Sequence, residues 1–281
     1  MHGSRPTRRP ASCRRCSRPA KWWAFWATIN DAPGLKSADI GLSVDGASGV
    51  AREAADMILL QSDLGVVADG VEEGRRTFAN ILKYVRMGAS SNFGNMLSMA
   101  AASVLLPFLP MLPTQILLNN LLYDVSEIGL PFDRVSPREI DRPQVWRMAD
   151  LIRFGAVMGP LSSAFDLATF ALLAWGFHLP AATFRTGWFL ESMATQILVI
   201  FLIRTREPFW RTRAHVALIV SSLGALAVAI ALPFSVAGPW LAFETPPLAA
   251  LAALSAIVLA YLACAEVTKR WAMGPPPAAI G

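Results

Sequence analysis

The sequence has 281 residues, of which 54% are hydrophobic and 16% are charged, and its formal net charge is +5. This composition is too apolar for an ordinary soluble domain and is typical of a polytopic helical membrane protein. It also argues against a nucleic-acid-binding protein, because the basic residues stand in an N-terminal run and in short loops between apolar spans. The cysteines Cys13, Cys16 and Cys264 form no disulfide framework, and the CxxC pair lacks the further ligands of a zinc site.

Residues 1–28 are rich in arginine, proline and tryptophan. The basic start is not followed by the apolar core and small-residue cleavage site of a signal peptide. We expect this segment to be disordered or to derive from a shifted reading frame.

Residues 29–70 read as soluble α/β structure. The pattern predicts short strands at 40–44 and 57–60 with one or two helical turns at 50–56 between them. Two strands and one helix cannot bury both faces of a parallel sheet, so we expect the end of a larger domain. Residues 71–87 then predict an amphipathic helix, interpreted as a stalk that continues into the membrane.

Apolar runs of near membrane-spanning length fill residues 88–270, which predicts an all-α polytopic membrane helical bundle. We expect six transmembrane helices, at 88–106, 114–131, 151–176, 188–204, 215–235 and 246–268. Residues 271–281 form a proline-rich tail.

Arginine is concentrated in alternate loops. The segments 132–150 and 204–214 are arginine-rich, and the C-terminus carries Lys269 and Arg270, whereas the intervening loops hold only Arg185. The positive-inside rule therefore predicts a multi-pass protein of the cell inner (plasma) membrane with both termini in the cytoplasm.

The second predicted span carries unexpected polar residues. Asn120, Asp124 and Glu127 are spaced i, i+4 and i+7, which predicts that they share one helical face. An ionisable side chain inside a membrane costs roughly 2.5–3.5 kcal/mol on insertion scales, so such a face indicates an ion or substrate path.

Several motifs resemble P-type cation-transporting ATPases over about residues 29–270. The match begins at Asn30-Asp-Ala-Pro-Gly-Leu, continues at Val50-Ala-Arg-Glu-Ala-Ala-Asp, and includes Ser90-Ser-Asn-Phe-Gly-Asn. Two sequence segments, Asn119-Asn-Leu-Leu-Tyr-Asp and Gly187-Trp-Phe-Leu-Glu, are most similar to the bacterial magnesium-translocating branch. This resemblance implies that residues 29–70 are the truncated end of a haloacid-dehalogenase-like phosphorylation domain, and that the predicted spans are the family's fifth to tenth helices.

The family's mechanism is implied only for an intact pump. There ATP phosphorylates an aspartate in an Asp-Lys-Thr-Gly motif, which divides the reaction into two steps. This sequence contains neither that motif nor the actuator Thr-Gly-Glu, so we expect the chain to be inactive alone and to need the N-terminal part of the same pump as partner. Asn30 and Asp31 resemble the pair that contacts phosphate and supports the catalytic Mg²⁺, whereas Ala27 stands where the family has a magnesium-binding aspartate. The valine codon GTG becomes the tryptophan codon TGG when it is read one base late, which motivates the frame-shift interpretation.

The resemblance also implies ligands for the transported ion. Asn92 and Asn95 match ion-site positions, although paired amides also serve as interhelical contacts. Asp124, with Asn120 beside it, is the main coordinating candidate. Glu127 is either an entry ligand or the partner of an interfacial arginine. Asp166 and Glu191 are weaker candidates, with packing, proton countertransport and ion exit as alternatives.

One carboxylate with amide oxygens suits Mg²⁺, which retains waters and uses few carboxylates. The leading interpretation is the membrane part of an ATP-driven Mg²⁺ pump, surrounded by lipid. The alternatives are a catalytically inactive membrane fragment or scaffold, a calcium- or manganese-type pump, and a channel or secondary transporter.

Overall fold

The structure is a computed structural model that describes residues 24–26, 32–61, 63–141 and 143–274. The chain forms two compact units, one extending to Gly74 and the other beginning at Arg75. The proposed catalytic residues Asn30 and Asp31 and the tail 275–281 lie outside the described residues.

The first unit contains a three-stranded parallel sheet in the order β1-β2-β3. Its strands are β1 (Ala24–Trp26), β2 (Ile40–Val44) and β3 (Met57–Leu59), and two short helices, α2 (Ala32–Ser37) and α3 (Gly49–Ala54), accompany them. Leu35 and Ala51 form its small buried core. The strand expected at 40–44 is present, and the strand expected at 57–60 ends at Leu59. Ala24–Trp26 differs from the disorder expected for 1–28, because β2 offers a parallel edge that this aromatic segment pairs with.

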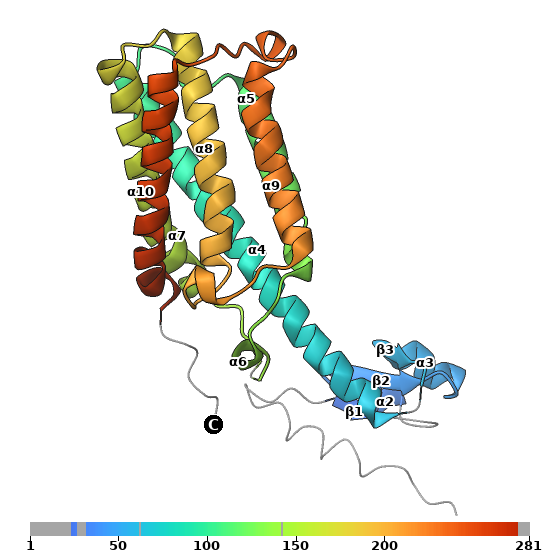
Figure 1. Cartoon of the computed structure of the whole chain (residues 1–281). Helices are drawn as coiled ribbons and strands as arrows, with labels where there is room; N and C mark the ends of the chain where they lie inside the picture. The colour runs from blue at the N-terminus through green and yellow to red at the C-terminus, as the bar shows by residue number, and fades with distance from the viewer. Residues whose placement is uncertain (1–23, 27–31, 62, 142, 275–281) are drawn as a thin grey trace, which may run out of the picture. The chain divides into compact units, whose positions relative to one another are not determined.

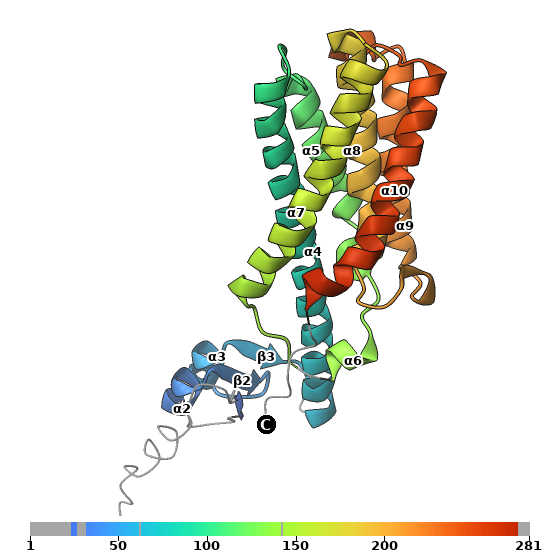
Figure 2. The same cartoon turned by 90° about the vertical axis from the view of Figure 1, so that its left-hand side faces the viewer.

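The second unit is a helical bundle (Figures 1 and 2). Helix α10 packs against α7 and α8, and α5 packs against α9. The helices are α4 (Leu64–Leu105, which begins in the first unit), α5 (Pro113–Glu127), α6 (Pro137–Ile140), α7 (Met148–Ala171), α8 (Ala181–Ile203), α9 (Val216–Ala231) and α10 (Leu248–Met273). A π-helical turn, η3 (Leu172–Gly176), extends α7.

Several helix ends differ from the predicted bounds. The predicted stalk begins at Leu64 rather than at 71, as part of one continuous helix α4. Helix α8 begins at Ala181 rather than at 188, and α10 continues to Met273 rather than to 268. At the end of α10, Lys269 and Arg270 lower the local hydropathy, although no helix-breaking residue precedes Gly274.

Among the described residues, four helical segments are long and apolar enough to cross a membrane: Met148–Gly176, Ala181–Ile203, Val216–Phe234 and Leu248–Met273. They overlap the last four predicted spans. Helix α5 has 15 residues, fewer than the ~20 that a typical hydrocarbon core requires. The short helix η2 (Leu130–Phe132) follows it.

Small residues allow close helix contacts in this bundle. Ser163 Oγ donates to the carbonyl of Gly94, 3.0 Å away, which joins α7 to α4. Ser221 and Ser222 both donate to the carbonyl of Ser126, at 3.0 and 2.9 Å, and thereby join α9 to α5. Membrane helices typically associate through small residues and interhelical hydrogen bonds, because the hydrophobic effect does not drive helices together within lipid.

A buried ionic cluster joins three segments at the end of the bundle where α5 finishes. Asp133, in the loop after α5, accepts from Lys83 of α4 at 2.9 Å and from Arg204 at the end of α8 at 3.2 Å. The backbone N–H of His215, before α9, also donates to Asp133, at 3.3 Å. Asn80 adds hydrogen bonds to the carbonyls of Pro131 and Asp133. One carboxylate therefore fixes α4, α8 and the start of α9 together.

Candidate functional site

The polar face predicted on α5 is divided by burial. Pro113 occupies the first turn of α5, where its missing N–H costs nothing. Gln115, fully buried, donates to the carbonyls of Leu241 and Ala242 and so fixes the start of the helix. Further along, Asn120 and Asp124 are exposed on the described bundle, whereas Glu127 is buried. The three residues lie on neighbouring parts of the helix surface, and Glu127 lies at the edge that faces the bundle.

Glu127 is surrounded by polar groups of the bundle. The Tyr123 hydroxyl lies in hydrogen-bond contact with Glu127 and with Ser91 of α4. One carboxylate oxygen of Glu127, Oε1, is buried without a hydrogen-bond partner. A buried oxygen without a partner costs about 1–3 kcal/mol or more, which makes this atom a candidate ligand for a cation.

The two asparagines of α4 have different surroundings. Asn92 is exposed, while Asn95 is half-buried. The side chain of Asn95 accepts a hydrogen bond from Gln196 Nε2 of α8, at 3.3 Å. Gln196 also accepts from Ser91 Oγ at 3.0 Å and donates to Ser192 Oγ. Asn95 therefore makes the kind of interhelical amide contact that is common between membrane helices. This hydrogen bond directs the side-chain oxygen of Asn95 toward α8.

Asn119 of α5 belongs to the same network. Its Nδ2 lies 3.5 Å from Ser192 Oγ, and its Oδ1 is buried without a partner. Sequence reasoning did not select Asn119, Gln196 or Tyr123 as site residues. The available signals were the asparagine pair at 119 and 120 and a glutamine in the middle of an apolar span.

Asp166 of α7 and Glu191 of α8 form a second buried group. The Asp166 carboxylate accepts from Ser98 Oγ of α4 at 2.6 Å and from Trp188 Nε1 of α8 at 2.9 Å. Glu191 lies in hydrogen-bond contact with Asp166. Sequence spacing did not predict this pairing, because the two residues lie on different helices.

The network contains uncharged oxygen donors and few carboxylates. Asn119 Oδ1 and Glu127 Oε1 of α5 and Glu191 Oε2 of α8 are buried oxygens without partners. Oxygen atoms of this type are the ligands that Mg²⁺ and Ca²⁺ prefer. Within the described part of the chain, no group of three or more His, Cys, Asp or Glu side chains is arranged to hold a metal ion. A cation bound here would therefore depend on amide oxygens, hydroxyls and water as well as on carboxylates.

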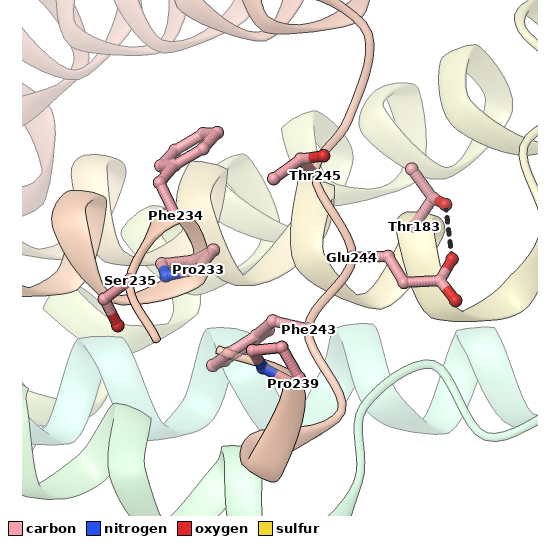
Figure 3. Close-up of a pocket in the computed structure, with 8 residues that line it drawn as sticks. All are labelled: Thr183, Pro233, Phe234, Ser235, Pro239, Phe243, Glu244 and Thr245. Carbon is pink, nitrogen blue, oxygen red and sulfur yellow. Dashed lines mark hydrogen bonds between the residues drawn. The ribbon is translucent and has the colours of Figure 1, made fainter. Parts of the chain in front are cut away.

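A separate depression of about 520 Å³ lies at the opposite end of α8 from Arg204 (Figure 3). Thr183 of α8 donates to the Glu244 carboxylate at 3.0 Å, and the two side chains point toward one another in Figure 3. The other lining residues come from the segment between α9 and α10: Pro233, Phe234, Ser235, Pro239, Phe243 and Thr245. None of the predicted site residues lines this depression.

The chain is similar to curated bacterial ion pumps. It is 49% identical over 246 residues to the magnesium-transporting ATPase, P-type 1, of Escherichia coli K12, covering 86% of this chain and 27% of that protein. It is 48% identical to the protein of the same name from Salmonella typhimurium LT2, with the same coverage. A calcium-transporting ATPase of Bacillus subtilis is 41% identical over 105 residues, or 37% of this chain and 11% of that protein.

The chain thus spans about a quarter of the length of the magnesium-transporting relatives. A family model described as "Cation transporting ATPase, C-terminus" matches residues 108–271, which includes α5 to α10 apart from the end of α10. The match covers the apolar helices and most of the polar network described above. The chain belongs to the family of cation-transporting ATPase C-terminal regions, the membrane part of P-type pumps.

Proposed function

We propose that this chain provides the ion-binding membrane part of an ATP-driven Mg²⁺ pump. The relatives that match most of its length carry the name magnesium-transporting ATPase, and they match across the polar network. The remainder of such a pump is the proposed partner of this chain. ATP, the catalytic Mg²⁺ and the phosphorylated aspartate would belong to the assembled protein, with Asn30 and Asp31 acting at its phosphorylation site.

Asp124 is the residue on which this proposal mainly rests. It lies exposed, with Asn120 one turn before it, on a helix of a membrane bundle. An ionised aspartate that faced lipid would cost several kcal/mol, so this face requires either a cation or further protein against it. Glu127, one turn further on and buried with an unpartnered oxygen, places a second carboxylate near the same face.

The amides complete the proposed ion site. Asn95 is oriented by Gln196, and Asn92 lies one turn before it on α4. With Asn92, Asn95, Asn120, Asp124 and Glu127, the site would offer two carboxylates and three amides. This limited charge suits a single Mg²⁺ ion that retains part of its water shell.

The membrane arrangement follows the same proposal. Helix α5 and the C-terminal part of α4 would be the first two of six spans, shortened or polar because they line the ion path. The arginine-rich ends of α7, α8 and α10 would then lie in the cytoplasm, with the protein in the cell inner membrane. Residues 29–70 would complete the phosphorylation domain.

A chimeric pump tests this function. Residues 29–270 replace the corresponding segment of the Escherichia coli relative, and the chimera is expressed in cells that depend on a pump for growth at low Mg²⁺. We expect growth and Mg²⁺-dependent ATPase activity from the chimera, and loss of both in Asp124→Asn. The matched control, Asp150→Asn, removes a partly exposed carboxylate at the start of α7 and should retain activity.

Two outcomes would contradict the proposal. A chimera that reaches the membrane and forms no phosphoenzyme from ATP would favour the inactive fragment. A chimera in which Ca²⁺ or Mn²⁺ rather than Mg²⁺ stimulates ATP hydrolysis would assign the site to a different divalent ion.

A further inference from the structure

The depression beside Thr183 is lined by residues that hydrogen bonds hold in place (Figure 3). The backbone N–H of Glu244 donates to Thr186 Oγ1 at 2.9 Å, and the Glu244 carboxylate accepts from Thr183. One residue earlier, the N–H of Phe243 donates to the carbonyl of Gly238 at 3.0 Å, and the Phe243 side chain is buried in the core of the bundle. The depression is therefore pre-formed, as binding sites for small ligands usually are.

The backbone at Ala242 shows how firmly this segment is positioned. Its φ of 57° and ψ of 35° lie in the left-handed region, which is uncommon for a residue with a side chain. The carbonyl of Ala242 accepts from the buried Gln115 of α5 at 3.3 Å. Such a conformation persists where the surrounding structure fixes it, and it occurs frequently where proteins hold ligands. The turn leads directly into Phe243 and Glu244, which both line the depression.

The lining favours a cationic group. Of the described residues that line the depression, only Glu244 carries a charge. Within the same part of the chain, no Lys, Arg or His side chain forms an ion pair with Glu244. Arg185, two positions after Thr183, donates instead to the carbonyl of Leu109. The negative charge of Glu244 is therefore uncompensated, and an anionic ligand would be repelled.

The depression lies at the level where membrane-spanning helices end. It is bounded by the start of α8, by the turns after α9 and by the chain that leads into α10. Each of these helices belongs to a segment that is long and apolar enough to cross a membrane. Trp240 and Leu248, which flank the lining segment, are 88% and 82% exposed. Tryptophan is enriched at the membrane–water interface, so these residues place the depression beside the lipid headgroups.

We propose that this depression binds the headgroup of an ethanolamine phospholipid, with Glu244 in contact with the ammonium group. A primary ammonium donates three hydrogen bonds, and the carboxylate of Glu244 can accept more than the one bond that it receives from Thr183. The exposed hydroxyl of Thr245, the next residue in the chain, is a donor for the phosphate. The volume of about 520 Å³ falls within the roughly 300–1,000 Å³ of typical small-molecule sites.

The surroundings favour a lipid over a soluble amine. Phe234 lines the depression and is half-exposed, so it offers apolar surface to the glycerol end of a lipid rather than to a small polar molecule. Helices α9 and α10 both pack near α8 but make few contacts with each other, and the depression lies at the loop that joins them. Acyl chains below the headgroup would lie along these two helices. The proposal requires that the bundle lies in a membrane and does not depend on the proposed Mg²⁺ site.

Photo-crosslinking of the full chain in lipid nanodiscs tests the proposal. Two lipid probes are compared, a phosphatidylethanolamine and a phosphatidylcholine, which carry the same acyl chain with a diazirine near the glycerol. Choline has no N–H to donate, so it is the matched control for the ammonium group. We expect the ethanolamine lipid to crosslink to residues 233–245 roughly threefold more than the choline lipid, a modest ratio because Glu244 is exposed. Mass spectrometry of the digested chain locates the crosslinked peptide.

Substitutions of Glu244 identify the group that recognises the amine. Glu244→Gln removes the charge but keeps an oxygen that accepts from Thr183, and it should lower crosslinking by the ethanolamine lipid to the choline level. Glu244→Lys should instead favour a phosphatidylglycerol probe. The matched control Glu207→Gln removes an exposed carboxylate from the loop between α8 and α9 and should leave the ethanolamine preference unchanged. Circular dichroism verifies that each variant retains its helical content.

Four results would overturn the proposal. The first is equal crosslinking by the two lipids in the unmodified chain, a comparison that needs no variant. The second is an ethanolamine preference that persists in Glu244→Gln or does not change in Glu244→Lys. The third is crosslinking of the same peptide by a photoreactive ethanolamine without acyl chains, which would assign the site to a soluble amine. The fourth is displacement of the lipid probe by Mg²⁺ but not by NaCl of equal ionic strength, which would assign Glu244 to a metal ion.

Discussion

Lys83 and Asp133 form an ion pair, with 2.9 Å between Nζ and Oδ2, in which the side chains are 6% and 0% exposed. Lys83 lies on α4 and Asp133 in the loop after α5, so the pair joins two segments that are 50 residues apart. Arg204 contacts the same carboxylate from the end of α8. Two buried cations therefore share one anion, and Asp133 is the member whose loss leaves the largest uncompensated charge.

Replacement of Asp133 by asparagine should destabilise the bundle strongly. The substitution leaves Lys83 and Arg204 buried without a countercharge, and breaking a buried ion pair typically costs roughly 3–5 kcal/mol. We expect Lys83→Met to cost less, because Asp133 keeps Arg204 as partner. The measurement is SDS-induced unfolding of the chain in micelles, followed by circular dichroism.

The partly exposed pair of Arg153 and Asp150 provides the comparison. Its atoms are 3.5 Å apart, and the side chains of Arg153 and Asp150 are 41% and 48% exposed. Asp150→Asn should change the free energy of unfolding by about 0–1 kcal/mol, as for other exposed pairs. Equal effects of Asp133→Asn and Asp150→Asn would contradict the structural importance of the buried cluster.

Gly129, just after the end of α5, lies close to the backbone of Leu218 in α9. A Cβ atom at this position would lie 2.4 Å from Leu218 Cα and 2.5 Å from Leu218 N, and backbone atoms cannot move aside as a flexible side chain can. Gly129→Ala should therefore destabilise the bundle by roughly 1–3 kcal/mol, as other overpacked positions do. SDS-induced unfolding of the variant measures this.

Gly155 of α7 is the control for Gly129. A Cβ atom there meets no heavy atom within 4 Å. Because alanine favours a helix over glycine by about 1 kcal/mol, Gly155→Ala should be neutral or stabilising. A destabilisation of similar size in both variants would mean that the close contact with Leu218 does not determine the effect.

Gln196 should affect ion affinity more than stability. Its side chain orients Asn95 and contacts Ser91 and Ser192. In the chimeric pump, Gln196→Leu should raise the Mg²⁺ concentration for half-maximal ATPase activity by roughly tenfold, which corresponds to one hydrogen bond of about 1.4 kcal/mol. Phosphorylation by ATP in saturating Mg²⁺ should persist. The control is Gln144→Leu, in the loop before α7. If Gln196→Leu left the Mg²⁺ dependence of ATPase activity unchanged, the hydrogen bonds of Gln196 would not contribute to ion binding.

Long apolar runs made the last four spans predictable, since length and hydropathy alone determine which segments suit a membrane. Helix ends were less predictable. The start of α8 contains Thr183, Arg185 and Thr186, which lower the local hydropathy, but Thr183 and Arg185 bond to Glu244 and to the Leu109 carbonyl in the fold. Such tertiary partners satisfy polar side chains that a hydropathy pattern counts against a helix.

The site was predictable only within each helix. Helical spacing predicted one face for Asn120, Asp124 and Glu127 of α5, whereas the structure buries Glu127 and leaves Asn120 and Asp124 exposed. Spacing carries no information on the contact of Asp166 with Ser98, 68 residues earlier in the sequence, or on the contact of Gln196 with Asn95, 101 residues earlier. Those contacts arise from the way in which separate helices pack, which one sequence does not encode in a periodic pattern.

The proposed membrane orientation predicts which loops face the outside. In a background with Cys13, Cys16 and Cys264 replaced by serine, Val236→Cys places a thiol in the 89%-exposed position between α9 and α10, and Arg211→Cys places one in the arginine-rich loop between α8 and α9. Positive-inside placement predicts that a membrane-impermeant maleimide labels Val236→Cys in intact spheroplasts and labels Arg211→Cys only after permeabilisation. The cysteine-free background controls for non-specific labelling. Labelling of Arg211→Cys in intact spheroplasts would contradict the orientation, because α9 lies between the two positions and a single crossing must separate them.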